Sequence, residues 1–263
     1  MDREYASAYR ELYGNHWWWR ARESLILAEL RRRLPSVARS RSVLDVGCGD
    51  GLFFDRLAEF GEVDGVEADP LLVDPRGPHA ERIYIGPFGD DFRPHRRYDL
   101  ILMLDVVEHL PDAEAGLRRA AELLTDDGLL IVTVPAFNAL WTAHDDFNHH
   151  YTRYTKRSFA AVAERAGVAV DERRYFFHWT VPVKLAVRGV ETVLRRKSRP
   201  ASVPPAWINR TLYGLSRLEQ AVCRRLPPPM GSSLLAVCRR ATPHVAAAAD
   251  TRPEAAELSG VGA

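Results

Sequence analysis

The sequence has few cysteines, little net charge and no long apolar run. Its three cysteines, Cys48, Cys223 and Cys238, are odd in number and far apart, which argues against a disulfide scaffold and predicts a reduced, cytoplasmic setting. The formal net charge of +1 gives no overall electrostatic case for a nucleic-acid partner. No apolar run approaches the roughly 18 residues that span a bilayer, and the first residues lack the pattern of a signal peptide. We therefore expect no transmembrane segment and a cytoplasmic protein.

A short β-branched run followed by a glycine cluster is the most informative stretch. Residues 42–46 read as a buried strand, which breaks into Gly47-Cys48-Gly49-Asp50-Gly51 before helical spacing resumes. A strand that feeds a glycine turn and then a helix lets the backbone approach a ligand closely and points free N–H groups at it. The sequence therefore predicts a ligand site at this turn.

The glycine turn does not fit a phosphate-bearing nucleotide. The third glycine of a dinucleotide motif would fall on Leu52 or Phe54, and no Lys-Ser/Thr pair follows as in a P-loop. Asp45 ends the strand and would repel a pyrophosphate but attract a cation. Glu67, at the expected end of the second strand, is placed to accept both hydroxyls of a ribose. A ribose, an adenine and a cationic sulfonium together make S-adenosylmethionine.

Three motifs in order resemble those of the class I S-adenosylmethionine-dependent methyltransferases. They are Val43 to Gly51, Gly65-Val66-Glu67-Ala68-Asp69-Pro70, and Tyr98-Asp99-Leu100-Ile101 through Asp105-Val106-Val107-Glu108-His109-Leu110. The resemblance implies an enzyme that uses S-adenosylmethionine to methylate a small molecule. It also implies cofactor contacts from the turn, from the ends of the strands and from the loop after the third strand, namely Asp45, Gly47, Cys48, Gly49, Glu67, Ala68, Gly86, Phe88, Leu104 and Asp105.

The resemblance implies an α/β, Rossmann-like fold with a seven-stranded, mostly parallel sheet, helices on both faces and an antiparallel last strand. Its expected parts are an N-terminal helical lid over 1–40, a methyltransferase domain over 41–241 and a disordered tail over 242–263. Within the domain, residues 180–229 form a helical insertion before the last strand. The acidic pair Asp171-Glu172 should interrupt the sixth strand, and Thr125 to Gly128 should form a turn.

The N-terminal segment carries three consecutive tryptophans, Trp17 to Trp19. Three neighbours cannot share one helix face, so at least one meets a partner, a ligand or solvent. They either pin the segment to the core or form an aromatic lid, because aromatic faces attract a sulfonium and exclude water. Similar Trp-Trp-x-Arg segments in small-molecule methyltransferases favour Trp19 and Arg20, with Arg22, as cofactor contacts.

The loop after the fifth strand is rich in groups that can carry a proton. His144, His149 and His150 fall within seven residues, together with Asp145. The loop emerges at the carboxyl edge of the sheet, where open α/β folds bind ligands. Imidazole titrates near neutral pH, so His149 or His150 is expected as the base, with His144 and Asp145 orienting or substituting for it. A polar surface loop is the plainer alternative.

The Asp105-x-x-Glu108-His109 spacing occurs in some O-methyltransferases of the ubiquinone pathway, where it can hold a divalent cation. The same segment also occurs in metal-independent relatives, where the histidine is structural, so we expect no metal.

In the insertion, apolar residues at helical spacing within 182–197 give a stripe that suits peripheral membrane contact, a homodimer or ordinary packing.

The expected function is O-methylation of a small-molecule acceptor with a loop histidine as base. N-methylation remains open, because an amine needs little more than placement, and so does a non-catalytic protein that binds S-adenosylmethionine and a partner. The acceptor and the oligomeric state are not encoded in any motif.

Overall fold

We describe the chain from a computed structural model that places residues 3–34, 41–194, 201–225 and 228–241. The predicted tail over 242–263 lies outside the described residues, as does the end of the 182–197 stretch from residue 195 onward. The division of the chain at residues 40 and 41 stays a prediction.

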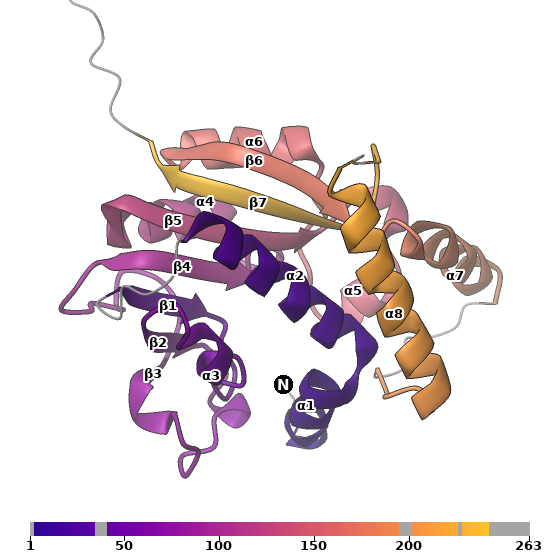
Figure 1. The fold of residues 1–263 in the computed structure, drawn as a ribbon, viewed down its shortest axis with the longest axis horizontal. Coiled ribbons are helices and arrows are strands. Elements are labelled where there is room, and N and C mark those ends of the chain that lie inside the picture. Colours follow the sequence, from indigo (N-terminus) through magenta and orange to yellow (C-terminus); the bar gives the residue numbers. More distant parts are fainter. Residues whose placement is uncertain (1–2, 35–40, 195–200, 226–227, 242–263) are drawn as a thin grey trace, which may run out of the picture.

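Among the described residues, seven strands form one sheet, and this confirms the predicted fold (Figure 1). Their order is β3-β2-β1-β4-β5-β7-β6, and β7 runs antiparallel to both of its neighbours. The strands are β1 (Ser42–Val46), β2 (Glu62–Glu67), β3 (Ile83–Ile85), β4 (Tyr98–Leu104), β5 (Leu124–Pro135), β6 (Val168–Phe176) and β7 (Ser233–Arg240). The order places the carboxyl ends of the parallel strands at one edge, which is where ligands bind in such sheets.

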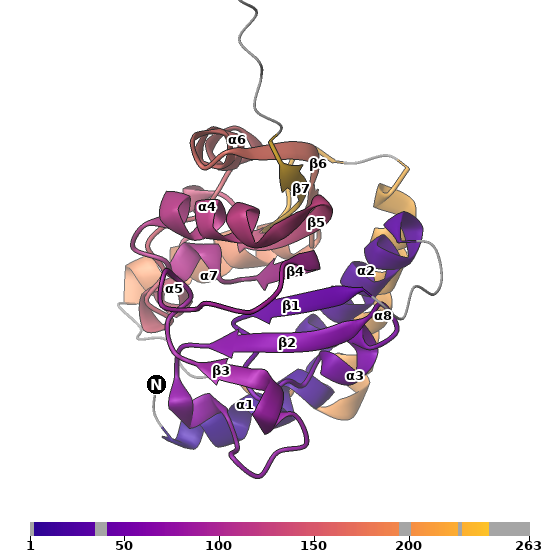
Figure 2. The ribbon, with the colours of Figure 1, turned by 90° about the vertical axis from the view of Figure 1, so that its left-hand side faces the viewer.

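The helices cover both faces of the sheet (Figure 2). They are α1 (Arg3–Asn15), α2 (Trp17–Arg33), α3 (Phe54–Leu57), α4 (Ala113–Leu123), α5 (Ala143–Phe147), α6 (Lys156–Arg165), α7 (Thr180–Leu194) and α8 (Ala206–Cys223). One apolar core joins α4 and α6 to the sheet through Leu117, Ala120 and Phe159. A second core joins α2 and α3 to the other face through Ile26, Leu30 and Leu57. The alternation of side chains along β1 and β4 supplies both cores.

Three local details differ from, or refine, what the sequence predicts. The helix after the glycine turn is only four residues long. The chain then re-enters the sheet at β2, where the Glu62 amide donates a hydrogen bond of 2.9 Å to the Arg41 carbonyl. Strand β5 includes residues 125–128, which were expected as a turn, but its pairing with β4 jumps from Tyr98↔Leu124 to Leu100↔Leu129. The irregularity predicted at Asp171 in β6 is present as a register shift between Val170 and Glu172.

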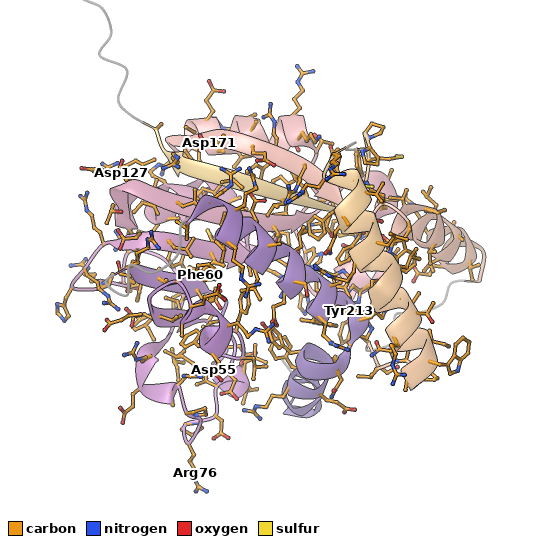
Figure 3. All side chains as sticks on the ribbon, in the orientation of Figure 1. Asp55, Phe60, Arg76, Asp127, Asp171 and Tyr213 are labelled. Carbon is orange, nitrogen blue, oxygen red and sulfur yellow. The ribbon has the colours of Figure 1, made fainter. Side chains whose placement is uncertain are left out.

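Helices α1 and α2 meet at a corner, and α8 stabilises this corner through hydrogen bonds. His16 caps α2 by accepting a bond from the Trp18 amide. Asn209 of α8 accepts a bond from the Trp17 amide at 2.8 Å and donates one to the Asn15 carbonyl at 2.7 Å. Figure 3 shows Tyr213 on the same helix, beside α2, where its hydroxyl lies 3.2 Å from Ser24 Oγ. The corner is therefore held by residues far away in the sequence.

Helix α2 is tied to strand β6 through a buried carboxylate, Glu29. Its side chain accepts hydrogen bonds from Arg32 at 2.6 Å, from Arg33, and from Arg174 of β6 at 2.8 Å. Burial alone would raise the pKa of Glu29, but these guanidinium groups bring it below its ordinary value. Glu29 therefore stabilises the fold above the pKa of an unfolded glutamate, and this stabilisation is lost as the pH falls through the folded pKa.

We expect Glu29→Ala to lower the free energy of unfolding by about 2–4 kcal/mol, because it removes the buried carboxylate from three guanidinium groups. Among the described residues, those groups then keep only the more exposed Glu172 as a counter-charge. Glu59→Ala is the matched control, since Glu59 pairs with Arg31 at the exposed surface and such pairs contribute about 0–1 kcal/mol. Urea denaturation followed by circular dichroism measures both changes. Equal losses in the two variants would contradict the role given to Glu29.

Candidate functional site

A cavity of about 630 Å³ opens at the carboxyl ends of β1, β2 and β4. This volume suits a small-molecule site. Its walls come from the ends of these strands, from the loop after β5, and from α1, α2 and α7, so the N-terminal helices form part of the site. Most of the predicted cofactor residues line it: Asp45, Gly47, Cys48, Glu67, Ala68, Phe88, Leu104, Asp105 and Trp19.

The glycine turn brings Glu67 into the cavity wall. Gly47 has a φ of 71°, and a Cβ there would lie 2.7 Å from Val106 Cγ2, so this position requires glycine. The amides of Gly49 and Asp69 donate to the two oxygens of Glu67 at 2.8 and 2.9 Å. Gly49 is therefore not itself a lining residue but holds a lining carboxylate in place. Burial raises the pKa of Glu67, and these amides partly offset the rise.

Asp45 ends β1 close to Glu67 and Arg22. Burial raises the pKa of Asp45 to about 7, Arg22 opposes the shift and Glu67 adds to it. A buried carboxyl with this pKa favours a cationic or hydroxyl-bearing ligand, which would stabilise its charged form. The neighbouring Cys48 thiol has its pKa raised by burial, so Cys48 packs in the wall and is not a nucleophile.

Asp105 ends β4 in a left-handed backbone conformation with a φ of 57°. Its Oδ2 accepts hydrogen bonds from Arg22 of α2 and from Thr133 of β5, the latter at 3.2 Å. A non-glycine residue at this φ is uncommon and marks a constrained position. The pair with Arg22 joins the N-terminal helices to the end of the central strand, and both residues line the cavity.

The three tryptophans both pack against neighbouring side chains and line the cavity. Trp17 packs on Phe177 and Trp179, with ring centroids 5.8 and 5.2 Å away. Trp18 lies 4.9 Å from the Arg22 guanidinium, and it contacts Trp19 edge to face. All three also line the cavity, as do His16, Tyr9 and Tyr13. Both interpretations of the tryptophans therefore have support, since they pin the helix and present aromatic surface to a ligand.

Besides Gly49, two predicted cofactor contacts, Arg20 and Gly86, do not reach the cavity. The Arg20 guanidinium lies over the Tyr213 ring, 4.7 Å from its centroid, because Arg20 falls on the opposite side of α2 from Trp18 and Arg22. The Gly86 amide donates to the Glu67 carbonyl at 2.8 Å. Gly86 thus continues the β2–β3 ladder, while Phe88 lines the cavity two residues later.

The histidine-rich loop places two of its three candidate bases in the cavity. His150 lies in the wall, and its Nδ1 is 2.8 Å from Asp145 Oδ1. His144 also lines the cavity, and its pKa is lowered to about 4 by burial and by Lys184. His149 is exposed, has a φ of 56° and does not line the cavity. The predicted role of His149 is therefore not supported by its position.

Asp145 is fully buried beside His150, and both of its carboxylate oxygens accept hydrogen bonds. Arg153 contacts both of its oxygens at 2.8 and 2.9 Å, and the Thr142 amide donates to Oδ2 at 2.9 Å. Although burial opposes it, the bonds from His150 and Arg153 lower the pKa of Asp145 below its ordinary range. Asp145 is thus an ionised acceptor, so the shared proton belongs to His150 Nδ1, and Nε2 is left to accept another.

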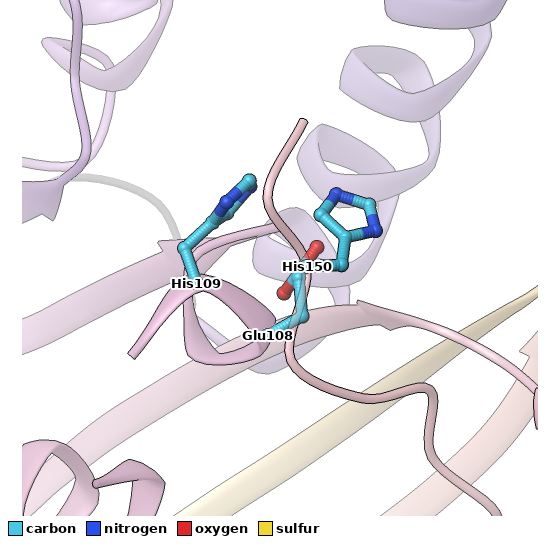
Figure 4. Close-up of side chains that lie close together, drawn as sticks. All are labelled: Glu108, His109 and His150. Carbon is cyan, nitrogen blue, oxygen red and sulfur yellow. The ribbon is translucent and has the colours of Figure 1, made fainter. Parts of the chain in front are cut away.

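Glu108 and His109, which follow β4, lie beside His150 (Figure 4). One ligand atom from each falls within 4.8 Å of the other two, so these three residues could hold a metal ion. The trio differs from the one suggested by the sequence, because Asp105 is bound to Arg22 and His150 takes its place. Burial raises the pKa of Glu108 well above its ordinary value, and its Oε2 has no hydrogen-bond partner among the described residues.

Several lining residues were missed by sequence reasoning, chiefly Tyr9, Tyr13, Asn148, Lys184, Ser232 and Ser233. Tyr9 and Tyr13 are four apart on α1 and thus share a helix face, a signal that could have been used. Lys184 and the serines approach the cavity only through the packing of α7 and β7, which no local pattern reveals.

The family described as a methyltransferase domain matches residues 18–173, more than half of the chain. Ubiquinone biosynthesis O-methyltransferases from Bradyrhizobium diazoefficiens and Coxiella burnetii are 32% and 33% identical over 97 and 99 residues. Each alignment covers 35% of this chain, and 38% and 42% of the respective relative. The match thus spans about two fifths of the length of these curated relatives.

Solved structures share the fold at low sequence identity. A chain of the complex between the Haloferax volcanii Trm112 methyltransferase activator and a proposed methyltransferase has a TM-score of 0.57 and 17% identity, with coverage of 92% of this chain and 96% of that one. A TehB-like methyltransferase from Corynebacterium glutamicum has a TM-score of 0.50 and 19% identity, with coverage of 90% and 96%. These likenesses support the fold alone.

Proposed function

Because the chain belongs to the class I S-adenosylmethionine-dependent methyltransferases, we propose that it methylates a hydroxyl oxygen of a small-molecule acceptor, with His150 as the base. The cofactor supplies the activated methyl group on its sulfonium. The protein's task is then to align the acceptor, exclude water and remove the hydroxyl proton.

The residues present fit S-adenosylmethionine. Glu67 lines the cavity and is held by two backbone amides, which leaves its remaining lone pairs to accept bonds from ribose hydroxyls. Asp45 and Asp105 add carboxylates for the cationic part of the cofactor. Trp18 and Trp19 offer aromatic faces that attract a sulfonium and keep water out.

The observation that carries the O-directed proposal is the hydrogen bond between His150 Nδ1 and the buried Asp145. In the neutral imidazole, Nδ1 donates to Asp145, so Nε2 is the nitrogen that would take the acceptor proton. Asp145 would stabilise the imidazolium that results. A neutral amine acceptor needs no such base during the transfer, so the dyad favours a hydroxyl over the N-methylation alternative.

Incubation of the purified protein with S-adenosylmethionine and a panel of hydroxylated acceptors should produce S-adenosylhomocysteine, and EDTA should not abolish the reaction. We expect metal independence because burial raises the pKa of Glu108 well above its ordinary value, and a protonated carboxyl is a poor metal ligand. Product formation is measured by chromatography, with an amine panel alongside. Cofactor binding without turnover on any acceptor would favour the non-catalytic alternative, and loss of activity in EDTA with recovery in Mg²⁺ would assign Glu108, His109 and His150 to an ion.

A surface contact through the insertion remains a second proposal about this chain's partners. Val183, Leu185, Val187 and Val190 of α7 are exposed, and they support peripheral membrane contact or a homodimer. Within the described ranges, no helix is long and apolar enough to cross a membrane.

A further inference from the structure

Lys184 lines the cavity, and its ammonium group has no hydrogen-bond or ion-pair partner among the described residues. It lies on α7, near the N-terminal end, and lines the same cavity as His144 and His150. It makes no hydrogen bond or ion pair with any residue in the parts of the chain that the structure describes. Lys184 is half-buried, and a cation that faces a cavity without a direct partner favours a ligand with negative charge.

The carboxylates that influence Lys184 are each bound to another donor. They are Asp145, Asp105 and Glu191. Asp145 is bound by Arg153, His150 and Thr142, and Asp105 by Arg22 and Thr133. Glu191 lies outside the cavity wall and accepts a bond from the Ala143 amide at 2.9 Å. Their charges act on Lys184 from a distance, and none of the three makes a hydrogen bond or ion pair with it among the described residues.

The remaining groups around Lys184 are cationic or neutral. Arg153 is buried close by, and His144 lines the same part of the cavity. Burial and the charge of Arg153 lower the pKa of Lys184 to about 8, against the opposing influence of the three carboxylates. At neutral pH Lys184 is still mostly protonated, so this region of the cavity keeps positive charge.

We propose that Lys184 binds an anionic oxygen of the acceptor, a carboxylate or a phosphate, while the acceptor hydroxyl meets His150. The inference rests on the proposed function, because it places the acceptor in the cavity beside the donor. It restricts the substrate class to hydroxylated acids. Lys184 is then a positioning residue that holds one end of the acceptor while proton removal takes place at the other.

The test compares matched ligands that differ only in the acid group: protocatechuate with catechol, and glycerol phosphate with glycerol. Binding of each to the S-adenosylhomocysteine complex is measured by calorimetry for the wild type, Lys184→Met, Lys184→Arg and Lys156→Met. Lys156 is the control because it packs over Tyr175 and does not line the cavity. The two pairs separate a carboxylate from a phosphate as the source of the anion.

We expect the wild type to bind the acid of one pair about tenfold or more tightly than its neutral partner, as one charge-assisted bond provides. Lys184→Met should abolish this preference, whereas Lys184→Arg and Lys156→Met should keep most of it. Retention by Lys184→Arg would show that the positive charge at this position, rather than the lysine itself, provides the preference. A preference that survives in Lys184→Met, or a wild type without preference in either pair, overturns the inference. Failure to bind S-adenosylhomocysteine at all counts instead against the proposed function.

Discussion

Glu67→Gln should weaken the binding of S-adenosylhomocysteine by roughly a hundredfold or more. Glu67 is expected to accept bonds from both ribose hydroxyls, and each bond to a charged acceptor contributes about 1.5–3 kcal/mol. The variant also disturbs the turn, because the glutamine amide group cannot accept from both Gly49 and Asp69 as the carboxylate does. Isothermal titration calorimetry with S-adenosylhomocysteine measures the loss.

Glu62→Gln provides the control for this experiment. Glu62 begins the same strand, β2, but is exposed at its opposite end, where it pairs with Arg96. We expect its affinity for S-adenosylhomocysteine to match that of the wild type. Circular dichroism should show that both variants are folded. Near-normal binding by Glu67→Gln would remove Glu67 from the cofactor site, and the proposed orientation of the cofactor with it.

His150→Ala should lower kcat by about 10²–10⁴-fold on a hydroxylated acceptor, the range expected for loss of a general base. The affinity for S-adenosylhomocysteine should change little, because the proposed function places the acceptor, and not the cofactor, beside His150. Steady-state rates with an acceptor found in the panel measure the effect. The same substitution should leave turnover of an amine acceptor largely intact, which separates O-transfer from N-transfer.

His149→Ala is an unusually close control, since it removes the same side chain one position earlier. His149 is exposed and lies outside the cavity wall, so we expect turnover close to that of the wild type. If His149→Ala lost as much activity as His150→Ala, the loop would act through its overall conformation and His150 would not be the base.

The part of the cavity wall that we assign to the cofactor was predictable from sequence because its determinants are local. A strand that ends in Asp45, a turn that needs glycine at position 47, and a second strand that ends in Glu67 lie within about 25 residues of one another. Parallel pairing of β1 and β2 in register then brings the two acids to one edge. Backbone geometry and chain direction suffice for this part.

The acceptor half could not be predicted to the residue. Choosing between His149 and His150 depends on the left-handed conformation at His149, with a φ of 56°, which turns the chain within the loop. Arg20 was misplaced because its neighbours Trp19 and Arg22 do line the cavity, and helix phase relative to the sheet is a tertiary property. The Glu108–His109–His150 group joins residues about 40 apart in sequence through the fold alone.

The contacts of Asn209 with Asn15 and Trp17 have a consequence for how the enzyme is made. These bonds link residues 192 and 194 positions apart, and contacts of such long sequence separation close late in folding. During synthesis, α1 and α2 leave the ribosome long before Asn209, whose hydrogen bonds stabilise the corner between them. A nascent chain that ends before α8 should therefore present an open donor site, and the capacity to retain the methyl donor would be acquired only after α8 has been synthesised.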